Sequence, residues 1–394
     1  MAGQIIKRGE NKYLVRIFLG REGGKKKYHN KTINGNKKDA DRYLRKVLRE
    51  KDLGELVEPS KQILKEYLDT WLDTAVKIRV RERTYRDYKE KVKLYIKPAL
   101  GDFKLQTLSP EQIQGLYNKM LDEGKSARTV RLTHTILKNA LLQAVKWGKI
   151  TRNPADLVDL PRQNRTEMKV LTPDQAAAFM KATVLDKWKP FFSLMLSSGV
   201  RPGEALGLKW SDVDFVKNRI TICRSLTRTE GGGWELQEPK TNRSRRTIPL
   251  PAGVIDDLKE LKQKQDQEAA ERKRVIKWNL KGKETAEKYN DHDFVFASDN
   301  GEPMSDKNLF RRHFKPLLKD AKLPDIRLYD LRHTCATLLL AAGENPKIVS
   351  ERLGHASITL TLDTYSHVLP DMQQAAVEKL EALLFKKEPA EEQK

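Results

Sequence analysis

Three short stretches of the chain carry side chains suited to phosphate chemistry. They are Arg201-Pro-Gly-Glu204, Tyr329-Asp-Leu-Arg332 and the segment from His355 to Tyr365. Arginine presents a planar, permanently charged fork that can bind two phosphate oxygens at once. A tyrosine hydroxyl can attack phosphorus and form a covalent ester, and a histidine can donate or relay a proton. If the fold brings these residues together, they predict breakage of a phosphodiester bond.

Helix-end signals predict how the last segment is positioned. Asn345 can cap one helix, and Gly354 suits the left-handed residue that would end it. The chain would then turn sharply just before His355. Ser357 can cap a second short helix, which would present Tyr365 near His355.

Each of these residues, taken singly, has an ordinary structural explanation. The two arginines could pair with the nearby carboxylates of Glu204 and Asp330, and an isolated tyrosine commonly packs in a core. The three stretches occur together, however, in an order and spacing that resemble the catalytic domain of the tyrosine recombinases, the phage integrase family. The resemblance covers roughly the last 230 residues of the chain.

The resemblance implies a role for each residue. Arg201 and Arg332 would bind the non-bridging phosphate oxygens, and Tyr365 would attack phosphorus to give a 3′-phosphotyrosine. His355 would donate to a phosphate oxygen or relay a proton. Lys240 matches the lysine that the family carries on a hairpin and that protonates the leaving 5′ oxygen. Three arginines crowd the same stretch and leave this assignment open: Arg243, Arg245 and Arg246.

One position departs from the family pattern. The residue three before the second arginine is usually His or Lys, whereas this chain has Tyr329. A phenol donates one hydrogen bond but carries no positive charge, so a direct catalytic role for Tyr329 is in doubt. His333 is expected to point elsewhere along its helix, with substitution for Tyr329 as the alternative. Glu204 is the candidate carboxylate for orienting Arg201.

The charge of the chain indicates a polyanionic partner. Its 394 residues include 76 Lys and Arg against 54 Asp and Glu, a formal net charge of +22. Nucleic acid and an anionic membrane surface are the two candidates. No apolar run approaches the roughly 18 residues of a spanning helix, and the N-terminus lacks the apolar core of a signal peptide. We therefore expect a cytoplasmic, nucleoid-associated bacterial protein that binds double-stranded DNA and no membrane.

Cysteine and histidine usage argues against a metal or another cofactor. Cys223 and Cys335 form no CxxC pair, and the seven histidines show no ligand spacing. No cluster of carboxylates suits magnesium. We expect metal-free chemistry, and because a phosphotyrosine ester preserves the bond energy, we expect no requirement for ATP.

Residues 1–58 are expected to form a small basic domain. Three β-rich segments separated by turn signals predict a three-stranded sheet, and apolar residues at helical spacing from Lys37 to Lys51 predict a helix over one face. The unit resembles the arm-type DNA-binding domain at the N-terminus of many integrases. A solvated basic face is the alternative. The side chains expected on the open face against DNA are Arg16, Arg21, Lys25 and Lys27.

Residues 59–161 show helical periodicity and predict an all-α domain of four or five helices. In tyrosine recombinases such a core-binding domain clamps the face of the duplex opposite the catalytic domain. The candidate phosphate contacts are Arg79, Arg81, Arg83, Lys125, Arg128 and Arg131. Any one of these side chains could instead be a solvated helix residue with no role in binding.

The remaining chain, residues 168–385, is expected to be mainly helical with a small antiparallel sheet. Alternation from Arg219 to Arg224 and from Arg246 to Leu250 predicts two of its strands. The amphipathic segment from Asp371 to Phe385 resembles the helix that such enzymes dock onto a neighbouring subunit. Residues 386–394 are polar and predict a disordered tail.

Together these features predict a multidomain α+β protein and a DNA integrase that exchanges strands at specific sites to integrate or excise a mobile element. The resemblance implies that it acts as a homotetramer on DNA, is a monomer in free solution, and works with accessory DNA-bending and directionality proteins. Two rival functions remain: DNA relaxation by a type IB topoisomerase, and DNA binding by a catalytically silent regulator. The basic N-terminal module and the amphipathic tail favour the recombinase.

Overall fold

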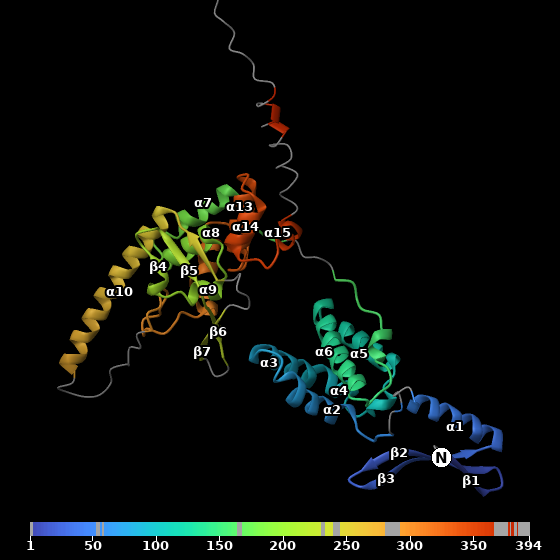
Figure 1. The fold of residues 1–394 in the computed structure, drawn as a ribbon. Coiled ribbons are helices and arrows are strands. Elements are labelled where there is room, and N and C mark those ends of the chain that lie inside the picture. The colour runs from blue at the N-terminus through green and yellow to red at the C-terminus, as the bar shows by residue number, and fades with distance from the viewer. Residues whose placement is uncertain are drawn as a thin grey trace, which may run out of the picture. The chain divides into compact units, whose positions relative to one another are not determined.

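The protein forms two compact units, residues 1–165 and residues 166–394 (Figure 1). We describe a computed structural model of the full chain, and each unit is considered by itself. The described residues are 3–52, 56, 59–163, 168–229, 233–238, 245–279, 292–365, 377, 378, 380, 381 and 384.

The first unit begins with a three-stranded antiparallel sheet in the order β1-β2-β3, covered on one face by a helix. Val15, Ile17 and Val47 form the centre of its small core. This arrangement confirms the predicted sheet and helix. The element bounds are β1 (Gly3–Gly9), β2 (Lys12–Glu22), β3 (Lys25–Asn34) and α1 (Lys37–Asp52).

The rest of the first unit is helical, as predicted from its periodicity. Its bounds are α2 (Leu64–Trp71), α3 (Glu82–Lys91), α4 (Lys97–Leu100), α5 (Pro110–Asp122) and α6 (Ala127–Lys146). Wide π-helical turns, Leu72–Val76 and Val92–Ile96, extend α2 and join α3 to α4. Helix α4 includes Pro98 and ends at Leu100, just before Gly101. Proline at one of the first two positions of α4 is tolerated, because its missing N–H needs no partner at the start of a helix.

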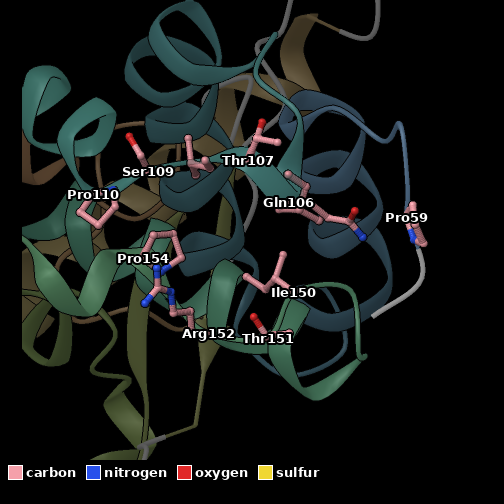
Figure 2. Close-up of a pocket in the computed structure, with 11 residues that line it drawn as sticks. Pro59, Gln106, Thr107, Ser109, Pro110, Ile150, Thr151, Arg152 and Pro154 are labelled. Carbon is pink, nitrogen blue, oxygen red and sulfur yellow. The ribbon is translucent and has the colours of Figure 1, made fainter. Parts of the chain in front are cut away.

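A cavity of about 440 Å³ lies in this helical part, between the segment leading into α5 and the loop after α6 (Figure 2). Gln106, Ser109 and Arg152 are among its lining residues. None of the predicted catalytic residues lines it, because all of those belong to the second unit. The cavity is therefore no part of the predicted reaction site.

The second unit combines helices with two small antiparallel sheets, β4-β5-β8 and β6-β7. Its helices are α7 (Pro173–Ala182), α8 (Lys189–Ser198), α9 (Pro202–Leu206), α10 (Ala252–Asn279), α11 (Asp306–Leu309), α12 (Lys315–Asp320), α13 (Asp330–Ala341), α14 (Pro346–Leu353) and α15 (Ile358–Tyr365). Its strands are β4 (Val213–Asp214), β5 (Arg219–Ile222), β6 (Ser225–Arg228), β7 (Trp234–Gln237) and β8 (Arg246–Pro249). Figure 1 shows α10 reaching well past the other helices of this unit.

Two apolar clusters stabilise the second unit. The larger one centres on the aromatic side chains of Phe179, Phe192 and Phe314 and includes residues of both sheets. A smaller one joins α13, α14 and α15, and Tyr365 is part of it. The site residues thus lie on helices whose mutual positions are fixed by apolar packing.

The predicted strands β5 and β8 are present and pair directly, whereas the β6-β7 hairpin was not predicted. Strands β6 and β7 pair with each other and form a two-stranded sheet separate from β4-β5-β8. Within the described residues, no helix is both long and apolar enough to cross a membrane. The predicted tail lies outside the described residues, as does most of the predicted docking helix, residues 371–385.

Candidate active site

The predicted helix ends position the segment around His355. The Asn345 side chain accepts a hydrogen bond from the Lys347 backbone N–H at 2.8 Å and caps α14. Gly354 ends α14 with φ +66°, in the left-handed region that favours glycine. The hydroxyl of Ser357 then accepts from the Leu360 N–H at 3.4 Å, at the start of α15. These observations confirm the expected sharp turn and second helix.

His355 is held by a threonine on the buried side of α15. Its Nδ1 lies 2.7 Å from the hydroxyl oxygen of Thr361, which is fully buried. Burial lowers the pKa of His355 to about 4, and the positive charges of Arg332 and Arg201 act in the same direction. The imidazole is therefore neutral near pH 7, and a phosphate brought beside it would favour its protonated form.

Tyr365 lies in the core of the smaller cluster with 1% of its surface exposed. Its hydroxyl lies 2.9 Å from Nδ1 of His333. Burial raises the pKa of Tyr365 well above its ordinary value, although Arg332 opposes this shift. The positive charge of Arg332 does not outweigh burial, and the phenol stays protonated.

The contact with His333 corrects an expectation from the sequence. His333 was expected to point elsewhere along its helix, yet its ring lies between those of Tyr365 and Tyr329, with centroids 5.8 and 5.2 Å away. Successive residues of a helix are separated by about 100° around its axis. Arg332 therefore points to α8 and the end of α14, while His333 faces α15.

Arg332 is fully buried and binds two backbone carbonyls. Its Nη1 donates to the Gly199 oxygen at 2.6 Å, and its Nη2 donates to the Leu353 oxygen at 2.7 Å. Burial lowers the pKa of Arg332 to about 10, with Arg201 adding to the effect. The alternative pairing with Asp330 does not occur, because that carboxylate binds Arg327 at 2.7 Å.

Arg201 and Arg246 share the carboxylate of Glu204. Arg201 donates through Nη1 at 2.8 Å and through its backbone N–H at 2.9 Å, and Arg246 donates through Nη2 at 2.8 Å. Burial would raise the pKa of Glu204, but the bonds from Arg246 and Arg201 hold it below its ordinary value. The contact expected between Glu204 and Arg201 is present, and 35% of the Arg201 side chain remains exposed.

Arg246 is a member of the site that the sequence did not identify. It begins β8, only 7% of its side chain is exposed, and its Nε donates to the Arg352 oxygen at 2.7 Å. In the sequence it was only one of several arginines near Lys240. The sequence signal that could have identified Arg246 was its place at the start of a predicted strand. A basic side chain that points into the core from such a strand needs a buried carboxylate as its partner.

Tyr329 lies at the start of α13 with 37% of its surface exposed. Burial acts to lower the pKa of Arg201, but Glu204 and then Tyr329 raise it above its ordinary value. Tyr329 therefore adjoins the guanidinium that the sequence assigned to phosphate binding. Lys240 lies outside the described residues, between β7 and β8.

The predicted DNA contacts belong to the first unit. Arg16 lies on the sheet face opposite the buried Val15 and Ile17, and its guanidinium carbon is 4.0 Å from the ring centroid of Tyr28. A bulge at Phe18–Gly20 shifts the register of β2. Beyond the bulge, toward the β2-β3 turn, lie Arg21, Lys25 and Lys27.

The predicted contacts in the helical part differ in their surroundings. Arg131 is half-buried and its Nε donates to the Pro161 oxygen at 2.8 Å, so it is bound to the backbone after α6. Lys125 is half-buried just before α6. The exposed members of the set are Arg79, Arg81, Arg83 and Arg128.

Comparison with known proteins identifies the family. The model of the phage integrase family matches residues 169–372, and that of the phage integrase N-terminal SAM-like domain matches residues 63–121. A "Tyrosine recombinase XerC-like" protein of Caldanaerobacter subterraneus is 30% identical over 395 residues, which cover 96% of this chain and 98% of the relative. The chain belongs to the phage integrase family. The recombinase is thus an enzyme that breaks and rejoins DNA at specific sites, as the sequence predicted.

Other matches agree with this assignment. The ICEBs1 integrase of Bacillus subtilis is 29% identical to the recombinase, over 76% of this chain and 78% of the relative. The Tn1549 transposon integrase, solved in complex with transposon right end DNA, is 26% identical with a TM-score of 0.64. That match covers 81% of this chain and 99% of the solved chain. The recombinase therefore shares its fold with integrases of mobile elements.

The buried carboxylate gives a prediction for stability. Replacing Glu204 by alanine leaves Arg246 without its carboxylate, and breaking a buried pair in this way costs about 3–5 kcal/mol. Urea denaturation of the full chain measures the loss. Because folding lowers the pKa of Glu204, its contribution is present above the unfolded pKa of about 4.3 and is lost as pH falls through the lower folded pKa.

The control is the exposed pair between Asp256 and Lys259 on α10, whose side chains are 63% and 50% exposed. Asp256→Ala is expected to change the free energy of unfolding by less than about 1 kcal/mol. Equal losses in the two variants would show that the Glu204 pairs do not stabilise the site.

Proposed function

We propose that the recombinase breaks a DNA strand with Tyr365 and holds it as a 3′-phosphotyrosine. The observation that supports this most is the pair of carbonyls bound by Arg332. Gly199 precedes Arg201 by two residues, and Leu353 precedes His355 by two residues. One side chain of α13 therefore fixes both phosphate-binding segments, and the next residue of α13 contacts the nucleophile.

Arg201 and His355 would contact the non-bridging oxygens of the phosphate. The guanidinium of Arg201 is partly exposed and is held by the buried Glu204, so it can bind phosphate without reorganising. Thr361 occupies Nδ1 of His355 and leaves Nε2 for a phosphate oxygen. Arg332 adds a buried positive charge behind these groups, where the low dielectric strengthens its effect on a developing negative charge.

Lys240 is the proposed acid for the leaving 5′ oxygen. It belongs to the segment between β7 and β8, whose base is closed by an ion pair between Arg245 and Glu238 at 3.2 Å. The next residue, Arg246, binds Glu204 and through it Arg201. The described residues that follow Lys240 in the chain are therefore linked to the phosphate-binding side of the site, which supports the assignment.

The proposed partner is double-stranded DNA carrying attachment sites, with a homotetramer forming on the DNA from monomers in solution. The net charge of +22 supports DNA binding. A lambda integrase was solved as a tetramer bound to a Holliday junction, and it shares the fold of this chain with a TM-score of 0.54. We place the enzyme in the bacterial cytoplasm at the nucleoid, with accessory DNA-bending and directionality proteins.

One experiment tests this function against its rivals. The enzyme is incubated with labelled supercoiled plasmid that carries two attachment sites, and both covalent adducts and exchanged products are measured. We expect both to form. Relaxation without exchange would indicate a type IB topoisomerase, and binding without any adduct would indicate a silent regulator.

The arm-type role of residues 1–58 gives a second prediction. Deleting these residues is expected to preserve cleavage of short core-site DNA and to weaken recombination of long attachment DNA, because the sheet would bind outside the crossover region. Single-turnover cleavage and recombination assays on the two substrates measure the difference. An equal loss of both activities would contradict this division of labour.

The docking role proposed for the C-terminal segment gives a third prediction. Removing residues 371–394 is expected to impair assembly on DNA while the second unit still folds, because the amphipathic stripe would dock on a neighbouring subunit. The mass of the complex on DNA, measured by light scattering, reports the assembly. A truncated protein that forms the same tetramer would show that docking occurs elsewhere.

A further inference from the structure

A buried nucleophile needs a proton acceptor. Tyr365 has 1% of its surface exposed, and burial keeps its hydroxyl protonated. When the oxygen attacks phosphorus, the phenol must lose that proton. Because little of the side chain reaches solvent, water is a poor acceptor, and a neighbouring side chain is required.

Within the described part of the chain, His333 is the titratable side chain in contact with this hydroxyl, at 2.9 Å from its Nδ1. The other basic groups of the site are already engaged. Nδ1 of His355 binds Thr361, and the carboxylate of Glu204 binds two arginines. Asp330 binds Arg327. Geometry therefore favours His333 as the acceptor.

The surroundings of His333 keep it able to accept a proton. Burial lowers its pKa and Arg332 acts in the same direction, although Asp330 opposes them. The ring is therefore neutral before the reaction, and one of its nitrogens carries a lone pair. As the phosphate oxygens gain negative charge in the transition state, an imidazolium near them becomes favourable.

The position of His333 along α13 explains why it can act as the proton acceptor. Tyr329 occupies the place where a basic residue was expected, and it has no charge to offer. Residues four apart lie on the same face of a helix, and the rings of Tyr329 and His333 are in contact. His333 thus presents a basic nitrogen on the same face, one turn further along.

We propose that His333 is a catalytic residue that accepts the phenol proton of Tyr365 during strand cleavage, an inference that rests on Tyr365 being the nucleophile. The Tyr365 oxygen forms a bond to phosphorus while its proton moves to Nδ1 of His333. The bond from phosphorus to the 5′ oxygen breaks, and that oxygen takes a proton from the acid assigned to Lys240. In rejoining, His333 returns its proton to Tyr365.

The first test replaces His333 by asparagine. An amide places a hydrogen-bonding atom near the position of Nδ1 but accepts no proton, so it separates holding the phenol from deprotonating it. We expect His333→Asn to slow single-turnover formation of the covalent adduct by about 10²- to 10⁴-fold. Binding of core-site DNA, measured by gel shift, is expected to stay within a few-fold of wild type.

The chain contains a matched control. In the first unit, Nδ1 of His134 lies 3.1 Å from the hydroxyl of Tyr117, which is also buried. His134→Asn disrupts the same kind of pair and is expected to leave the rate of adduct formation within a few-fold of wild type when DNA is saturating. A large loss in His134→Asn as well would show that the assay reports general destabilisation and would overturn the assignment of His333.

The second test changes the acidity of the nucleophile. A fluorinated tyrosine incorporated at position 365 has a more acidic phenol, which depends less on an acceptor. We expect His333→Asn to slow adduct formation much less in the protein that carries the fluorinated tyrosine. A wild-type rate in His333→Asn, or an unchanged loss with the fluorinated phenol, would overturn the proposal. A full adduct yield in Tyr365→Phe would instead refute the proposed nucleophile itself.

Discussion

Replacing Tyr365 by phenylalanine is expected to abolish the covalent protein–DNA complex and to leave DNA binding intact. The aromatic ring keeps its packing against Leu340, Val349 and Leu353, so the fold loses only a hydroxyl and its bond to His333. The cost to stability is about 1 kcal/mol, the usual net value of one hydrogen bond. Denaturing gels detect the covalent complex, and gel shifts under native conditions detect binding.

Tyr117→Phe is the control for this prediction, because Tyr117 is likewise buried and its hydroxyl contacts a histidine. That variant is expected to form the adduct as wild type does. An adduct that survives in Tyr365→Phe would reassign the nucleophile. Tyr329 would then be next, since 37% of its surface is already exposed.

Replacing Lys240 by alanine is expected to slow cleavage of normal DNA by about 10²- to 10⁴-fold, the usual effect of losing a positioned acid. Binding should change little. A substrate whose scissile 5′ oxygen is replaced by sulfur expels a thiolate, which needs no proton. The variant should therefore cleave the sulfur substrate nearly as fast as wild type in single-turnover assays.

Arg201→Ala is the comparison. Sulfur at the leaving position cannot replace the positive charge with which Arg201 stabilises the non-bridging oxygens. We expect the sulfur substrate to leave its defect unchanged. If sulfur instead rescued a change at Arg243, Arg245 or His355 but not at Lys240, the acid would be one of those residues.

Local signals in the sequence predicted much of the fold. The caps at Asn345 and Ser357 and the left-handed Gly354 depend on neighbours only a few residues away, and all three are present. The capping boxes at Ser109 and Thr172, which begin α5 and α7, are local features of the same kind. Such features need no knowledge of the tertiary structure, which is why the segments flanking His355 could be predicted correctly.

Contacts between distant segments could not be predicted in this way. Arg332 and Gly199 are 133 positions apart, and Arg246 and Glu204 are 42 apart. The orientation of His333 depends on where α15 packs, which no local pattern encodes. The protonation of Tyr365 likewise follows from burial in a cluster of three helices rather than from the charges nearby in the sequence.

Mapping the modified tyrosine tests the central claim most directly. A nicked core-site duplex that traps the covalent complex is incubated with the full chain, and the adduct is digested with trypsin and nuclease before mass spectrometry. Cleavage after Lys and Arg places Tyr365 in the peptide of residues 353–379 and Tyr329 in that of residues 328–332. We predict a nucleotide phosphate on Tyr365 in the first peptide. The same modification on the second peptide, with the first unmodified, would contradict the account of this site.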